Sequence, residues 1–151
     1  MRADGVQGTV RPTRINKMAT IKLEIVTPEA KTFSEDVDMV TLTGTEGEMG
    51  ILPQHMPLMT GLVAGEIIAR KGGQNIYLAV GDGFVQVTGD RVAILTDMAV
   101  RAENIDEARA EEARQRAEAR LAEHITAEES AAASAVLAHS LAQLKVKRRQ
   151  R

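Results

Sequence analysis

The sequence predicts an antiparallel β-sandwich followed by two α-helices. Up to Glu103, short apolar runs alternate with Gly, Pro, Asp and Asn; beyond it, glycine and proline disappear and alanine becomes common. Many short strands at spacings of about 8 to 12 residues are typical of an antiparallel sandwich or barrel. Alanine-rich stripes at helical spacing are typical of helices that pack through one face.

Strands are expected where apolar and polar residues alternate with period 2. The first such run, residues 21–25, should stop at Thr27-Pro28 because proline cannot donate to a β-ladder. The second, residues 39–42, should end at Gly44. Two hairpins with glycine-containing turns are expected next. In the first, residues 62–70, with a bend at Ala64-Gly65, pair with residues 76–80 across the turn 71–74. In the second, residues 84–88 pair with residues 91–96 across Gly89-Asp90. Aliphatic side chains and three aromatic residues should fill the core: Phe33, Tyr77 and Phe84.

Two helices are expected after Glu103. Asn104 is a good N-cap for the first, with Asp106 and Glu107 in its first turn, where the helix dipole favours carboxylates. Thr126 to Glu129 match a capping box that starts the second helix, and so short a break predicts an antiparallel hairpin. The apolar stripes are Ala110, Ala113, Ala117, Leu121 and Ile125 on the first helix, and Ala133, Val136 or Leu137, Leu141 and Leu144 on the second.

The hairpin's own packing is expected to be thin. The first helix offers mostly alanine, and each buried CH₂ contributes only about 0.8 kcal/mol. This favours an arm that changes posture, although many alanine-rich hairpins simply stay docked.

Four segments follow from these patterns. We expect a disordered extension (residues 1–18), a sandwich (19–102), a two-helix hairpin (103–147) and a basic tail (148–151). The extension has no apolar h-region, so it is not a secretory signal, and Asp4 argues against a transit peptide. An upstream start, with Met18 as the alternative initiator, is the other interpretation.

Charge is unevenly distributed along the chain. Residues 19–103 carry six basic and twelve acidic side chains, whereas the last seven residues hold five basic ones. An acidic body argues against a phosphate-binding face. By charge alone, the basic tip suits an acidic protein surface, nucleic acid or only water.

The sequence offers no enzyme site. His55, His124 and His139 fit neither a Ser/His/Asp order nor a metal spacing. The chain has no cysteine, which excludes disulfides and thiolate nucleophiles. Gly81-Asp82-Gly83 lies between two strands rather than before a helix, as a nucleotide-binding turn would. We therefore expect no catalytic residue, metal or resident cofactor.

The most distinctive segment is Gly44 to Pro57, GTEGEMGILPQHMP. Its glycines permit positive φ and close backbone approach, two prolines stiffen its exit, and its methionines add adaptable apolar surface. It presents Glu46 and Glu48. A contact loop and a well-formed surface turn are both consistent with this composition.

This segment resembles the G-x-x-G-x-x-G-[IV]-L/Y-P-x-H-x-P loop of ATP synthase epsilon subunits. Further stretches resemble that family in the same order, so that the resemblance covers about residues 19–146: Pro57 to Thr60, Tyr77 to Phe84, Val92 to Asp97, Ile105 to Ala110 and Leu141 to Val146. It implies a ten-stranded β-sandwich with a helical hairpin, in a non-catalytic rotor subunit of a proton-translocating F-type ATP synthase.

The resemblance also implies partners. The sandwich is expected to bind the gamma subunit and the c-ring, with the ring contact at Glu46, Gly47, Glu48, Met49 and Gly50. The extended hairpin is expected to reach the alpha and beta subunits of the catalytic head and to oppose ATP hydrolysis. Its basic residues would then meet the beta subunit: Lys145, Lys147, Arg148 and Arg149. No nucleic acid is implied, and the complex alone would hold the chain at the cytoplasmic side of a bacterial plasma membrane.

Some relatives bind regulatory ATP on the folded hairpin through an I/L-D-x-x-R-A motif, which this chain matches with Ile105, Asp106, Arg109 and Ala110. However, the second helix carries His139 and Gln143 where those relatives have arginines, so charge-assisted phosphate donors are missing. The other interpretation is that Asp106 caps the helix and Arg109 pairs on the surface. The alternative for the whole chain is a free-standing sandwich adaptor whose hairpin binds a protein partner.

Overall fold

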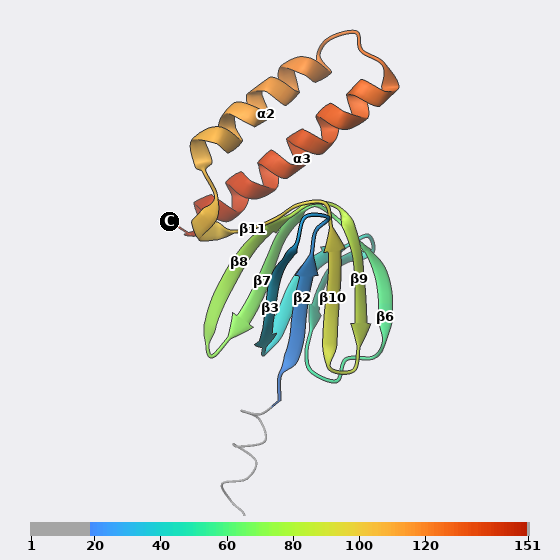
Figure 1. Cartoon of the computed structure of the whole chain (residues 1–151), viewed down its shortest axis with the longest axis vertical. Helices are drawn as coiled ribbons and strands as arrows, with labels where there is room; N and C mark the ends of the chain where they lie inside the picture. Colours follow the sequence, from blue (N-terminus) through green and yellow to red (C-terminus); the bar gives the residue numbers. More distant parts are fainter. Residues whose placement is uncertain (1–18, 151) are drawn as a thin grey trace, which may run out of the picture.

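The computed structural model describes residues 19–150 (Figure 1). The expected N-terminal extension, residues 1–18, lies outside the described residues, as does Arg151. A β-sandwich is followed by a short 3₁₀ helix and an α-helical hairpin, which confirms the predicted fold class. The strands are β2 (Ile21–Val26), β3 (Lys31–Val37), β4 (Met39–Gly44), β5 (Gly47–Ile51), β6 (Leu58–Leu62), β7 (Gly65–Lys71), β8 (Gln74–Val80), β9 (Gly83–Thr88), β10 (Arg91–Thr96) and β11 (Ala99–Arg101); the helices are η1 (Ala102–Asn104), α2 (Glu107–Leu121) and α3 (Ala127–Gln150).

The strands of the described chain form one ten-stranded sheet in the order β11-β8-β7-β4-β6-β9-β10-β2-β3, with β5 paired to β4. Neighbours are antiparallel except β10 and β2. The sheet nearly closes on itself. At its two ends, Arg101 of β11 donates a 2.7 Å hydrogen bond to Glu35 of β3 and lies 4.8 Å from the centroid of the Phe33 ring. Hydrogen bonds from Lys71 and then Arg101 hold the pKa of Glu35 below its ordinary value.

The core of the sandwich is aliphatic, as the period-2 pattern predicts. Ile21, Leu23 and Ile25 of β2 are completely buried. Every strand except β11 contributes a buried residue to the core cluster, and Ala99 of β11 packs against it. The expectation for the aromatic residues was wrong in part. Phe33 is buried in this core, but the Phe84 side chain is 64% exposed and Tyr77 lies outside the cluster, towards the hairpin.

Both predicted hairpin turns are present. Gly72 and Gly73 connect β7 to β8 with φ values of 58° and 82°, as a tight turn between twisted strands requires. Gly89-Asp90 connects β9 to β10. The expected strand 62–70 is instead two strands: β6 ends at Leu62 and pairs with β9, whereas β7 begins at Gly65 and pairs with β8.

Capping residues set where the hairpin helices begin. The N-cap of α2 is Asp106 rather than the predicted Asn104, which ends η1; the Asp106 carboxylate accepts the backbone N–H of Arg109 at 3.1 Å. The capping box of α3 is confirmed. Thr126 Oγ1 accepts from the N–H of Glu129, and Glu129 accepts from the N–H of Thr126, which holds the pKa of Glu129 below its ordinary value.

The hairpin buries mostly small side chains. Ala110, Ala117 and Ala133 are buried, as their spacing predicts, and so is Leu144. Leu141 was expected in the seam but is 48% exposed, and Ser140 is buried in its place, with its hydroxyl donating to the Val136 carbonyl. Helix α3 runs to Gln150, so it includes residues 148–150 of the expected tail. Among residues 19–150, neither α2 nor α3 has the length and apolar character needed to cross a membrane.

Candidate functional site

The arm, which we define as residues 104–150, docks on the sandwich through the C-terminal half of α3. Figure 1 shows the hairpin rising away from the strands, with the end of α3 beside β8 and β11. Helix α3 contacts β7, β8 and η1. Ala142 and Val146 pack against a small apolar cluster that is separate from the main core: Ala79, Ala102 and Ile105, bordered by Tyr77, Met98 and Val100. The docking surface therefore buries few large side chains.

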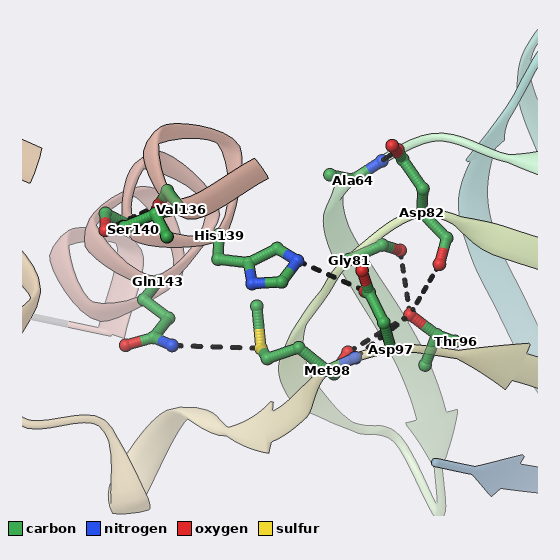
Figure 2. A network of polar contacts seen from close by, with 10 residues as sticks. All are labelled: Ala64, Gly81, Asp82, Thr96, Asp97, Met98, Val136, His139, Ser140 and Gln143. Carbon is green, nitrogen blue, oxygen red and sulfur yellow. Dashed lines mark hydrogen bonds and ion pairs between the residues drawn. The ribbon is translucent and has the colours of Figure 1, made fainter. Parts of the chain in front are cut away.

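Polar contacts line the same interface. His139 Nε2 lies 3.1 Å from Asp97 Oδ1, and the amide of Gln143 approaches the Met98 sulfur at 3.8 Å (Figure 2). In the sequence comparison, His139 and Gln143 occupy the positions at which ATP-binding relatives have arginines. The structure shows that both also face the sandwich.

The basic residues of the arm's tip divide into two groups. Lys147 donates to the Ala102 carbonyl at 3.3 Å, and Arg149 forms a 2.7 Å ion pair with Glu66, whose side chain is only 7% exposed. Arg149 also lies 5.7 Å from the Tyr77 ring centroid. Arg148 is 3.9 Å from Glu111 within the arm, and Lys145 is exposed. Two of the four predicted contact residues thus hold the docked arm to the sandwich.

A groove of about 450 Å³ runs between the two helices at their base, where Asp106 and Arg109 meet His139 and Gln143. The structure brings the motif residues together with α3, but in different roles. Ile105 and Ala110 are buried and form part of the lining of the groove. Asp106 already caps α2. Arg116 adds a cation that the sequence reasoning missed, and it pairs with Glu112 at 2.7 Å.

The glycine-rich segment is a β-hairpin rather than a loop throughout. Gly47 to Ile51 form β5, which pairs along β4, and Thr45-Glu46 make the turn. Gly47 has φ 121°, so the expectation of positive φ is met there. At Gly50, which is exposed, a β-carbon would lie 2.6 Å from Met39 Cε, the end of a flexible side chain that can move aside. Glu46 and Glu48 are exposed, as expected.

Sequence reasoning missed an apolar face on the sandwich. By strand register, Phe84 lies between Gly61 and Leu95, and Leu95 lies beside Val26. Phe84 and Leu95 are 64% and 54% exposed. We call Val26, Phe84 and Leu95 the apolar row. The alternation Phe-Val-Gln-Val could have revealed it: Val85 and Val87 are buried, so Phe84 shares the outer face with Gln86.

A recess of about 380 Å³ adjoins this row. Its lining is largely apolar, from Val26, Pro28 and Leu95, and Asp82 and Asp97 stand at it as well. An exposed apolar patch next to a recess is typical of a protein–protein contact surface. This surface does not overlap the strands on which α3 docks, because β2, β9 and β10 form it whereas α3 contacts β7 and β8.

Comparison with known proteins agrees with this architecture. Two family domains match in tandem: the β-sandwich domain of the ATP synthase delta/epsilon chain over residues 20–102, and its long α-helix domain over residues 103–148. An ATP synthase epsilon chain from Dehalococcoides mccartyi is 49% identical over 135 residues, which are 89% of this chain and 96% of that one. The epsilon chain of Acidithiobacillus ferridurans is 44% identical over 132 residues, covering 87% of this chain and 94% of its own.

Solved structures give the same result. A chain of the mitochondrial ATP synthase of Euglena gracilis, solved as an OSCP/F1/c-ring assembly, superposes with a TM-score of 0.70 at 25% identity, covering 84% of this chain and 80% of that chain. A chain from the central stalk and c-ring of the Tetrahymena thermophila enzyme has the same fold, with a TM-score of 0.55 at 13% identity over 84% of this chain and 96% of that one. The chain therefore belongs to the family of ATP synthase epsilon chains.

Proposed function

We propose that the chain is a non-catalytic rotor subunit whose sandwich joins the gamma subunit to the c-ring and whose arm opposes ATP hydrolysis when it extends. The observation that carries this proposal is the separation of two surfaces on one sandwich. The apolar row lies on β2, β9 and β10, and the arm docks on β7 and β8. The two surfaces adjoin at Asp97, which lines the recess and also contacts His139 of the arm. Because they otherwise lie on different strands, one surface can hold a partner while the other releases the arm.

The gamma subunit is the proposed occupant of the apolar row and the recess beside it. Exposed aromatic and aliphatic side chains are the residues that anchor protein interfaces. Replacing Phe84 or Leu95 with Asp should weaken gamma binding about 30-fold or more, the effect of losing a hot-spot residue. Leu141→Asp is the matched control, because Leu141 is similarly exposed but lies on the arm. Binding by Phe84→Asp at the level of the parent chain would refute this docking surface.

The tip of the β4–β5 hairpin is the proposed c-ring contact. It presents the carboxylates of Glu46 and Glu48 on a backbone turn that Gly47 makes possible. Because the chain has no cysteine, Glu48→Cys provides a unique attachment point. In the assembled enzyme it should cross-link to the polar loop of the c subunit. Efficient labelling of Glu48→Cys without a c-subunit product, while control positions do cross-link, would exclude this contact.

For the hairpin groove, we propose helix capping and packing rather than ATP binding. Asp106 caps α2, Ile105 and Ala110 are buried, and His139 and Gln143 already contact the sandwich. Titration of the full chain with ATP, followed by calorimetry, tests this directly. Saturable binding that Arg109→Ala abolishes would assign the groove to the nucleotide instead.

In the assembled enzyme the chain would be peripheral, reaching the cytoplasmic face of the bacterial plasma membrane only through its partners. The free-standing adaptor makes a different prediction. A chain of that kind would not co-purify with the gamma subunit, and its removal would leave ATP hydrolysis unchanged.

A further inference from the structure

A polar contact between His139 and Asp97 joins the middle of α3 to the sandwich. His139 Nε2 lies 3.1 Å from Asp97 Oδ1, and the two side chains are 26% and 53% exposed. Asp97 belongs to the short connection between β10 and β11. The pair therefore connects the arm to the sandwich at a point remote from the Arg149–Glu66 pair in the last turn of α3.

The backbone around Asp97 is held firmly. The buried hydroxyl of Thr96 lies 2.9 Å from the Gly81 carbonyl oxygen and 3.0 Å from that of Asp82 (Figure 2). The N–H of Gly81 donates to the Met98 carbonyl at 2.9 Å. These contacts tie the β8–β9 turn to the β10–β11 connection, so the Asp97 carboxylate is presented to α3 from a rigid support.

Glycine at position 81 makes the approach of the arm possible. A β-carbon there would overlap the Asp97 carboxylate and would lie 2.7 Å from His139 Nε2. Real β-carbons do not approach other atoms this closely, so any side chain at this position must displace one partner of the pair. Gly81, Asp97 and His139 thus form one contact. Asp97 and His139 supply the polar atoms, and Gly81 leaves the space that they occupy.

The rest of the interface is small. Ala142 and Val146 supply its buried apolar side chains from α3, and the Gln143–Met98 approach is a long contact to sulfur. The Lys147–Ala102 and Arg149–Glu66 contacts lie in the last turn of α3, away from His139. We propose that Gly81, Asp97 and His139 form a latch that sets the fraction of time the arm is docked, so that breaking the latch favours the extended posture. This inference rests on the proposed brake, because the latch would regulate it.

The test is a double-mutant cycle on the full chain. Spin labels on Gln74→Cys and Ala131→Cys, both exposed, report the distance between the sandwich and the arm. His139→Ala and Asp97→Ala should each raise the ratio of extended to docked molecules about two- to fivefold, as expected for a partly exposed pair. The double variant should show no further increase, because either substitution alone already removes the contact. His124→Ala, in the exposed link between the helices, is the control and should change nothing.

Gly81→Ala should produce the same shift while both partners keep their side chains. If that variant misfolds, the His139 and Asp97 variants still decide the matter. Effects of His139→Ala and Asp97→Ala that simply add, or an unchanged distance distribution in both, would overturn the latch. Measuring ATP hydrolysis by the assembled enzyme distinguishes this proposal from the proposed brake. If the latch variants shift the posture of the arm but neither they nor deletion of the arm changes hydrolysis, the brake is refuted and the latch stands.

Discussion

The sandwich and the arm differ in how much apolar surface each of them buries. The sandwich core contains Leu23, Ile67, Leu78 and Ile94, all completely buried. The arm buries mainly alanine, and among the described residues α3 buries only two large aliphatic side chains, Leu144 and Val146. Since hydrophobic stabilisation follows buried apolar area, the sandwich should be stable by itself and the arm should open at much lower cost. A posture change can then occur without loss of the fold.

The largest effect is expected from the core. Ile94→Ala should lower the free energy of unfolding by about 2 to 5 kcal/mol, because a cavity is left in a closely packed interior. Val146→Ala, which is also at a completely buried position, should leave global unfolding nearly unchanged and ease arm opening by about 1 to 2 kcal/mol. Urea unfolding followed by circular dichroism measures the first quantity. Equal losses of global stability in the two variants would show that the arm and sandwich unfold as one unit.

Removing the arm is the next largest change. Deleting residues 104–151 takes no described side chain from the main core cluster, so the remaining sandwich should keep its β-type circular dichroism and bind gamma. ATP hydrolysis by the assembled enzyme should rise several-fold if the extended arm opposes it. The measurement is steady-state hydrolysis after confirming that the complex is intact. Unchanged hydrolysis would leave the arm as a passive appendage.

Two basic residues of the tip should act in opposite directions. Arg149 holds the docked arm through Glu66, so Arg149→Ala should favour extension and lower hydrolysis about two- to fivefold. Lys145 is exposed in the docked arm and would contribute only to the extended contact, so Lys145→Ala should raise hydrolysis. Both effects should shrink at high salt, which screens exposed charges. Changes of the same sign would contradict this division of the tip.

The smallest effect concerns acid stability of the sandwich. Lys71 and Arg101 hold the folded pKa of Glu35 below its ordinary value of 4.5. Its stabilising contribution is therefore complete above pH 4.5 and is lost as pH falls through the lower, folded pKa. The stability difference between the parent chain and Glu35→Gln should be largest near neutral pH and shrink in acid. Denaturant midpoints across that range measure it, and a constant difference would argue against the tie between β3 and β11.

The sequence was informative wherever local patterns decide the structure. Period-2 runs identified β2, β4 and the β7–β8 and β9–β10 hairpins, and Thr126 with Glu129 identified the start of α3. It failed in two ways. Glycine-rich composition hid β5, although β5 pairs locally with β4, and the short β11 is a strand only because the distant β8 lies beside it.

The same limit applies to the candidate sites. The motif from Ile105 to Ala110 was visible, and the capping role of Asp106 is local and was one of the two interpretations offered. The burial of Ile105 and Ala110 depends on tertiary packing, which the motif does not show. The His139–Asp97 contact joins residues 42 positions apart, and no local pattern indicates it. The family resemblance supplied the expected partners, whereas the apolar row and the latch come from the three-dimensional arrangement.

Native-state hydrogen exchange of the full chain tests the central claim most directly. If the arm is a separable element on a stable sandwich, amides of α2 and α3 should exchange through openings that cost far less free energy than global unfolding. Amides of β8 and β10 should exchange only at the global cost, and His139→Ala should accelerate the arm alone. Equal protection of α3 and β8, lost together in denaturant, would contradict the account.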